Sequence, residues 1–164
     1  VTTTAGGGGG GTTTIHPIAD AKVDASTPTT NYGTTALRVD GSPVVRSYLK
    51  FDTSGVTGTV DSATLRIWAT SSQTTGFDVF GVSDSSWTEL GITAGNQPES
   101  SMASTKTGSS GPVTAGTWKT VDVTPLLPTP RVWSLVVTTT SGTALALSSR
   151  EDATHPPELV ITTH

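Results

Sequence analysis

The stretch 37–52, which reads LRVDGSPVVRSYLKFD, constrains the fold of this chain more than any other segment. Both flanks of the turn 40–43 alternate in character, and the Gly and Pro between them are typical of a tight connection between two strands. Successive side chains of a strand point to opposite faces. We therefore expect a β-hairpin with an apolar face that contains Leu49 and Phe51, and a basic face that contains Lys50.

The same two-residue alternation recurs at 63–69 and 132–137, whereas no helical period extends over ten residues. The 18 glycines and 10 prolines would divide the chain into short strands joined by turns. A chain of 164 residues is long enough for one such domain with a substantial core. We expect an all-β fold, a two-sheet antiparallel β-sandwich of the jelly-roll type. One core should receive Leu49, Phe51, Leu65, Ile67, Trp133, Leu135 and Val137.

Residues 1–14 consist only of Val, Thr, Ala and Gly, with six consecutive glycines at 6–11. Such a composition offers little apolar area to bury and is typical of a flexible linker. The segment is interpreted either as the tail of a linker in a multi-modular protein or as an expression scar. The β-sandwich module is expected to span residues 15–164.

The charge of the chain disfavours several classes of partner. With 9 basic and 13 acidic residues the net charge is −4, and sequence-independent nucleic-acid binding usually needs a basic domain. The absence of Cys excludes disulfide and zinc-thiolate frameworks, and no apolar run has the length needed to span a bilayer. We expect a secreted, extracellular bacterial protein that binds neither nucleic acid nor membrane.

The predicted basic face is the main candidate for ligand binding. Arg donates two parallel hydrogen bonds to a planar carboxylate, Lys adds a mobile charge, and an aromatic ring can stack on a sugar. An acidic polysaccharide is the expected ligand. The candidate binding residues are Lys22, Arg38, Arg46, Tyr48, Lys50, Arg66, Trp68 and Arg150. The alternative is that these cations pair with carboxylates across strands while the aromatic rings only pack.

Acidic residues near the first strand suggest a structural calcium ion. Asp20, Asp24 and Asp40 lie near expected turns, and Ca²⁺ takes six to eight oxygen ligands that include carboxylates and backbone carbonyls. No D-x-D-x-D-G loop accompanies them. The alternative is that these residues cap turns, which is an ordinary role of Asp.

No constellation typical of an enzyme occurs in the sequence. Glu151 and Asp152 are adjacent, so in a strand they would point to opposite faces and could not act together on one glycosidic bond. A G-x-S-x-G nucleophile elbow is missing. The long irregular stretch 83–112 is expected to be ordered by packing. Trp87, Trp118 and Trp133 are expected to be core or loop anchors rather than sugar platforms.

Short motifs occur in a defined order along the chain. They are ADA at 19–21, NYG at 31–33, LRVD at 37–40, SYLKFD at 47–52, SATL at 62–65, Trp87 with Glu89, GTW at 116–118, VDVT at 121–124, SSRE at 148–151 and PP at 156–157. This series resembles the DNRLRE-type domain, which overlaps carbohydrate-binding module family 96. The resemblance implies a β-sandwich binding module attached to a secreted polysaccharide-degrading enzyme, and an association with alginate. Relatives often carry an aromatic residue with Asn after the Trp, whereas this chain reads ITAGN at 92–96.

The residues and the resemblance together favour a non-catalytic carbohydrate-binding module that binds alginate or another polyuronate. We expect a monomeric module with a covalently linked catalytic module as its partner. A cell-surface structural or adhesion domain without sugar specificity is the alternative. A small polysaccharide lyase or hydrolase is disfavoured, because no acid and base pair can be named.

Overall fold

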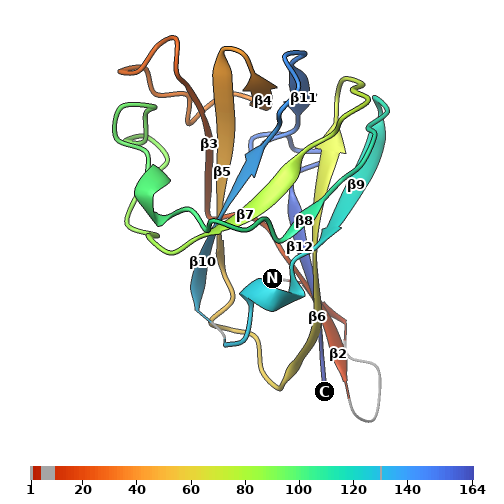
Figure 1. Ribbon diagram of the computed structural model, residues 1–164. Coiled ribbons are helices and arrows are strands. Elements are labelled where there is room, and N and C mark those ends of the chain that lie inside the picture. Colours follow the sequence, from red (N-terminus) through yellow and green to blue (C-terminus); the bar gives the residue numbers. More distant parts are fainter. Residues whose placement is uncertain (1, 5–9, 130) are drawn as a thin grey trace.

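Two antiparallel β-sheets pack face to face in the computed structural model of this chain, which describes residues 2–4, 10–129 and 131–164 (Figure 1). We call them sheet A and sheet B. Sheet A contains β1 (Thr2–Thr4), β2 (Gly11–Ile15), β12 (Glu158–Thr163), β6 (Val60–Ala69), β9 (Thr117–Asp122) and β11 (Leu145–Leu147). Sheet B contains β3 (Ala19–Asp24), β5 (Val44–Asp52), β10 (Val132–Thr138), β7 (Asp78–Val82) and β8 (Gly108–Ser109).

Strand β4 (Leu37–Gly41) connects the two sheets, since it pairs with β11 of sheet A and with the beginning of β5 in sheet B. The predicted hairpin is present, with Asp40 opposite Val45 and Gly41 opposite Val44. The peptide bond between Ser42 and Pro43 in the turn is cis. Because β4 belongs to both sheets, the hairpin links the two halves of the sandwich.

A single large core lies between the sheets and confirms the predicted β-sandwich. The alternating apolar residues of β5, β6 and β10 all point into it, as expected from the sequence. They are Leu49, Phe51, Leu65, Ile67, Trp133, Leu135 and Val137. Because β5 and β6 face this core from opposite sides, their remaining side chains point to opposite surfaces of the molecule.

The described part of the chain contains no helix longer than three residues. Its two helices are the 3-10 turns η1 (Glu99–Ser101) and η2 (Thr124–Leu126). Within this part, no helix is long and apolar enough to cross a membrane.

The first residues differ from the expected linker. Gly11 to Thr14 form most of β2, which pairs with β12, and Thr2–Thr4 form β1, which pairs with β2. These pairings place Thr2–Thr4 and Gly11–Thr14, which were expected in the linker, in sheet A. Residues 6–9 of the glycine run lie outside the described residues. Sequence composition did not indicate β2. Its threonines favour strands, but they follow a run of glycines that is typical of a flexible linker.

We expect Leu135→Ala to lower the free energy of unfolding by about 2–5 kcal/mol, because it leaves a cavity in the shared core. Val132→Ala in the same strand is the matched control, since Val132 is 38% exposed and should cost far less. Chemical unfolding of both variants measures the difference. Equal losses would contradict the assignment of Leu135 to the core.

Candidate functional site

The residues predicted to form one basic face lie on opposite surfaces of the sandwich. Arg46, Tyr48 and Lys50 point outward from β5 in sheet B, whereas Arg66 and Trp68 point outward from β6 in sheet A. The prediction of a single continuous face is therefore wrong. The alternation in each strand and the shared core agree with expectation, but the sequence does not state that β5 and β6 belong to different sheets, which face that core from opposite sides.

The remaining three predicted residues divide in the same way. Arg38 points outward from β4 opposite Ala146, on the side of sheet A. Lys22 lies on the edge strand β3, with its ammonium group 5.0 Å from the centre of the Tyr32 ring. Arg150 lies beyond β11, where its guanidinium contacts Glu89. Of the predicted residues, Arg38, Arg66 and Trp68 thus share the outer face of sheet A.

The outer face of sheet B is closed by the segment between β7 and β8, residues 83–107, which we call the covering loop (Figure 1). Trp87 and Ile92 from this loop form a second apolar cluster with Tyr48 and with neighbouring side chains of β3, β7 and β10. Tyr48 is completely buried, and its hydroxyl donates to Gln97 Oε1 at 2.9 Å. Burial raises the pKa of Tyr48 to about 12. This ring cannot be a sugar platform while the loop is in place.

The cations of β5 hold the covering loop. Lys50 is almost fully buried, donates to the backbone oxygen of Trp87 and lies 4.5 Å from the centre of the Trp87 ring. Burial lowers the pKa of Lys50. Arg46 pairs with Glu99 of the loop at 2.7 Å. For Arg46, Tyr48 and Lys50 the geometry therefore favours a packing role, which was the alternative interpretation of the sequence.

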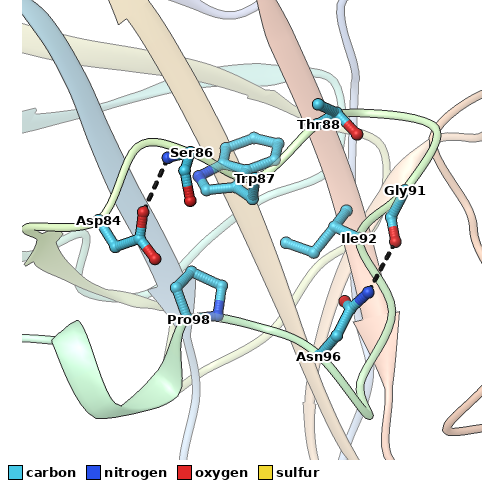
Figure 2. Close-up of a pocket in the computed structure, with 8 residues that line it drawn as sticks. All are labelled: Asp84, Ser86, Trp87, Thr88, Gly91, Ile92, Asn96 and Pro98. Carbon is cyan, nitrogen blue, oxygen red and sulfur yellow. Dashed lines mark hydrogen bonds between the residues drawn. The ribbon is translucent and has the colours of Figure 1, made fainter.

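A pocket of about 300 Å³ opens on the covering loop (Figure 2). Trp87 and Ile92 form its apolar wall, but the polar groups drawn beside them bind within the loop. Asp84 Oδ1 accepts from the Ser86 amide at 2.8 Å, and Asn96 Nδ2 donates to the Gly91 carbonyl at 2.9 Å (Figure 2). The apolar wall of this pocket consists of core anchors of the covering loop, so a ligand here would contact only the edges of Trp87 and Ile92, and it is the weaker candidate for a sugar site.

The outer face of sheet A carries a cluster of three partly exposed rings, Trp68, Trp118 and His155, which we call the aromatic platform. Trp68 and Trp118 are direct cross-strand partners on β6 and β9, with ring centres 5.6 Å apart. His155, in the loop 148–157, stacks on Trp68 at 3.9 Å with an angle of 10° between the rings. Aromatic side chains in such a cluster fix one another and leave an apolar surface on the sheet.

Charged groups border the aromatic platform. The Arg66 guanidinium lies 4.6 Å from the centre of the Trp118 ring and also pairs with Glu158, its cross-strand partner on β12. Arg38 pairs with Asp40 at 2.6 Å. Arg38 and Arg66 keep about a third of their side chains exposed, 37% and 34%. The site therefore combines partly exposed rings with guanidinium groups that still have donors available.

Sequence reasoning missed Trp118, His155 and Glu158 as members of this site. A signal existed for Trp118, because the alternation in β9 points it away from the buried Val121. Trp118 was instead expected to be a core or loop anchor rather than a sugar platform. No local pattern indicates His155, because its position depends on how the loop 148–157 folds back onto β6.

The three aspartates predicted as calcium ligands do not form one site. Asp24 Oδ1 accepts from the Ser26 amide at 2.8 Å, and Asp40 accepts from Arg38 and from the Ser42 amide. Both residues perform the turn chemistry that was the alternative interpretation. Asp20 lies four residues before Asp24 on β3, which corresponds to about 13 Å along a strand. The prediction of these ligands as one set is therefore wrong.

A β-sandwich with a partly exposed aromatic platform on one sheet is an arrangement expected of a carbohydrate-binding module. Residues 11–163 match the model of carbohydrate-binding module family 96. The chain belongs to this family, and it is a non-catalytic module that binds a carbohydrate. No curated protein matches it significantly.

Tyr48→Phe tests the packing role assigned to the outer face of sheet B. We expect the free energy of unfolding to fall by about 0.5–1.5 kcal/mol, because the hydrogen bond to Gln97 is lost. The affinity for carbohydrate should not change. Tyr32→Phe is the control, since this other tyrosine is partly exposed and its hydroxyl bonds to the nearby Thr27 at 2.9 Å rather than to the covering loop. Urea unfolding and affinity electrophoresis are the measurements, and a loss of affinity without a loss of stability would contradict the role.

Proposed function

We propose that the module binds its polysaccharide on the outer face of sheet A, across the aromatic platform and the adjoining guanidinium groups of Arg38 and Arg66. One observation carries this proposal. The rings of Trp68 and Trp118 are partly exposed on this face, whereas the covering loop closes the equivalent face of sheet B. An aromatic ring and the apolar side of a pyranose both lose water when they stack, and the charged border then orients the sugar.

An acidic polysaccharide such as alginate or another polyuronate is the proposed ligand. Arg66 uses Nη1 to bind Glu158, so its other nitrogen donors can bind a sugar carboxylate. Arg38 lies two strands from β6, about 10 Å across the sheet, and the strand register places it level with Thr70, about 13 Å along β6 from Arg66. Two guanidinium groups about 16 Å apart could contact acidic residues that are not adjacent in the polymer.

A neutral glycan is the second candidate. The observation that favours it is that each of these arginines already has a carboxylate partner, Asp40 for Arg38 and Glu158 for Arg66. An ion pair of this kind presents little net charge but still offers donors and acceptors to sugar hydroxyls. The two candidates differ in their response to salt, because exposed charges are screened beyond about 8 Å at 0.15 M.

The module is proposed to act as a monomer, covalently linked to a secreted bacterial enzyme that degrades the same polymer. Binding to the polymer raises the local concentration of the linked enzyme there, an effect that requires no chemistry in the module.

Affinity electrophoresis on a panel of acidic and neutral polysaccharides tests the proposal. Alginate should retard the protein at low salt, and the retardation should decrease at physiological ionic strength. Cellulose and chitin derivatives should retard it less. Salt-independent retardation by a neutral glucan would contradict the polyuronate assignment and would support the second candidate.

Arg66→Gln keeps a donor for Glu158 but removes the positive charge from the platform. We expect the affinity for a polyuronate to fall about tenfold to a hundredfold, the equivalent of a lost charge-assisted hydrogen bond of about 1.5–3 kcal/mol. Arg131→Gln is the matched control, because Arg131 also lies over an indole ring, that of Trp133, but outside the platform. Titration calorimetry with an oligouronate gives both affinities, and equal effects of the two changes would exclude Arg66 from the site.

A further inference from the structure

Three carboxylates meet at one end of β3, away from the aromatic platform. Asp20 of β3, Glu89 of the covering loop and Glu151 of the loop 148–157 offer oxygen atoms that all lie within 4.8 Å of one another. The three residues are far apart in the sequence and come from both sides of the sandwich. Three negative charges at such short range repel one another unless a cation compensates them.

Asp20 provides an independent sign that a ligand is missing from this cluster. Its side chain is completely buried, and Oδ2 accepts from the Arg150 amide at 2.8 Å. Oδ1 has no hydrogen-bond partner among the described residues. A buried carboxylate oxygen without a partner costs free energy, so the native state normally supplies it with a proton, a donor or a metal ion.

The charges within the cluster are only partly compensated. Glu89 Oε1 accepts from the Asp20 amide at 3.0 Å. Among the described residues, Arg150 contributes the one cation in direct contact, through Nη1, which lies 3.0 and 3.1 Å from the two oxygens of Glu89. Three carboxylates and one guanidinium leave two negative charges, which is the charge that one divalent cation balances.

We propose that Asp20, Glu89 and Glu151 bind a Ca²⁺ ion. Two oxygens on opposite sides of one Ca²⁺ lie about 4.6–5.2 Å apart, so three oxygens within 4.8 Å of one another can share the ion without large movements. Water molecules and backbone carbonyls would complete the six to eight oxygen ligands that Ca²⁺ takes. This ligand set differs from the one expected from the sequence and retains only Asp20.

The position of the site defines what the ion does. Asp20 belongs to sheet B, Glu89 lies two residues after the loop anchor Trp87, and Glu151 lies four residues before His155 of the aromatic platform. An ion held by all three would fasten the covering loop to β3 and fix the loop that places His155 on Trp68. The site is separate from the proposed sugar surface, so either assignment can fail without the other.

Calorimetric titration of the chelator-treated, desalted protein with CaCl₂ tests the proposal, with MgCl₂ as comparison. We expect one Ca²⁺ per chain, bound at least tenfold more tightly than Mg²⁺. The melting temperature should rise by about 5–10 °C at a hundredfold excess of Ca²⁺ over its dissociation constant, because the ion binds only the folded state. Absence of Ca²⁺ binding at millimolar concentration, or equal affinity for both ions, would overturn the proposal.

Two variants locate the ion. Glu151→Gln changes an exposed residue, so it should fold normally and weaken Ca²⁺ binding at least tenfold. Asp24→Asn is the matched control, because it removes a carboxylate from the same strand as Asp20 but outside the cluster. It should leave the Ca²⁺ affinity unchanged. If Ca²⁺ binding persists in Glu151→Gln, or is lost in Asp24→Asn, the assigned ligands are wrong.

Discussion

The shared core between β5 and β6 determines where every outward side chain of this module can act. Both strands bury alternate residues in that core, so Lys50 and Arg66 point to opposite surfaces although their local sequence patterns are similar. A sandwich of two sheets therefore offers two separate faces rather than one broad one. The function of the module depends on what covers each face.

The two faces differ because one of them receives a second apolar cluster. The covering loop buries Trp87 and Ile92 on sheet B, and Lys50 and Arg46 of β5 hold the loop through ionic and hydrogen-bonding contacts. Sheet A has no comparable layer over Trp68 and Trp118 in the part of the chain that the structure describes, and both rings remain partly exposed. Cations and aromatic rings thus pack under the covering loop on sheet B and stay partly exposed on sheet A, although they alternate with apolar residues in the same way in both strands.

The sequence was sufficient to predict the fold class, the central hairpin and the main core residues, because two-residue alternation reports directly which side of a strand is buried. It was insufficient for the site. Whether Tyr48 is exposed depends on a loop that begins 35 residues later, and the contact between His155 and Trp68 spans 87 residues. The same limit applies to the carboxylate cluster, in which Asp20 could be suspected from its position but Glu89 and Glu151 meet it only in three dimensions.

The four tryptophans of the chain make the central claim directly measurable, because each indole N–H gives its own signal in a ¹H–¹⁵N correlation spectrum. The account places Trp68 and Trp118 at the sugar surface, Trp87 under the covering loop and Trp133 in the shared core. On titration with an oligosaccharide of the bound polymer, the signals of Trp68 and Trp118 should shift progressively while those of Trp87 and Trp133 stay in place. Shifts confined to Trp87 would contradict the account and would assign carbohydrate binding to sheet B.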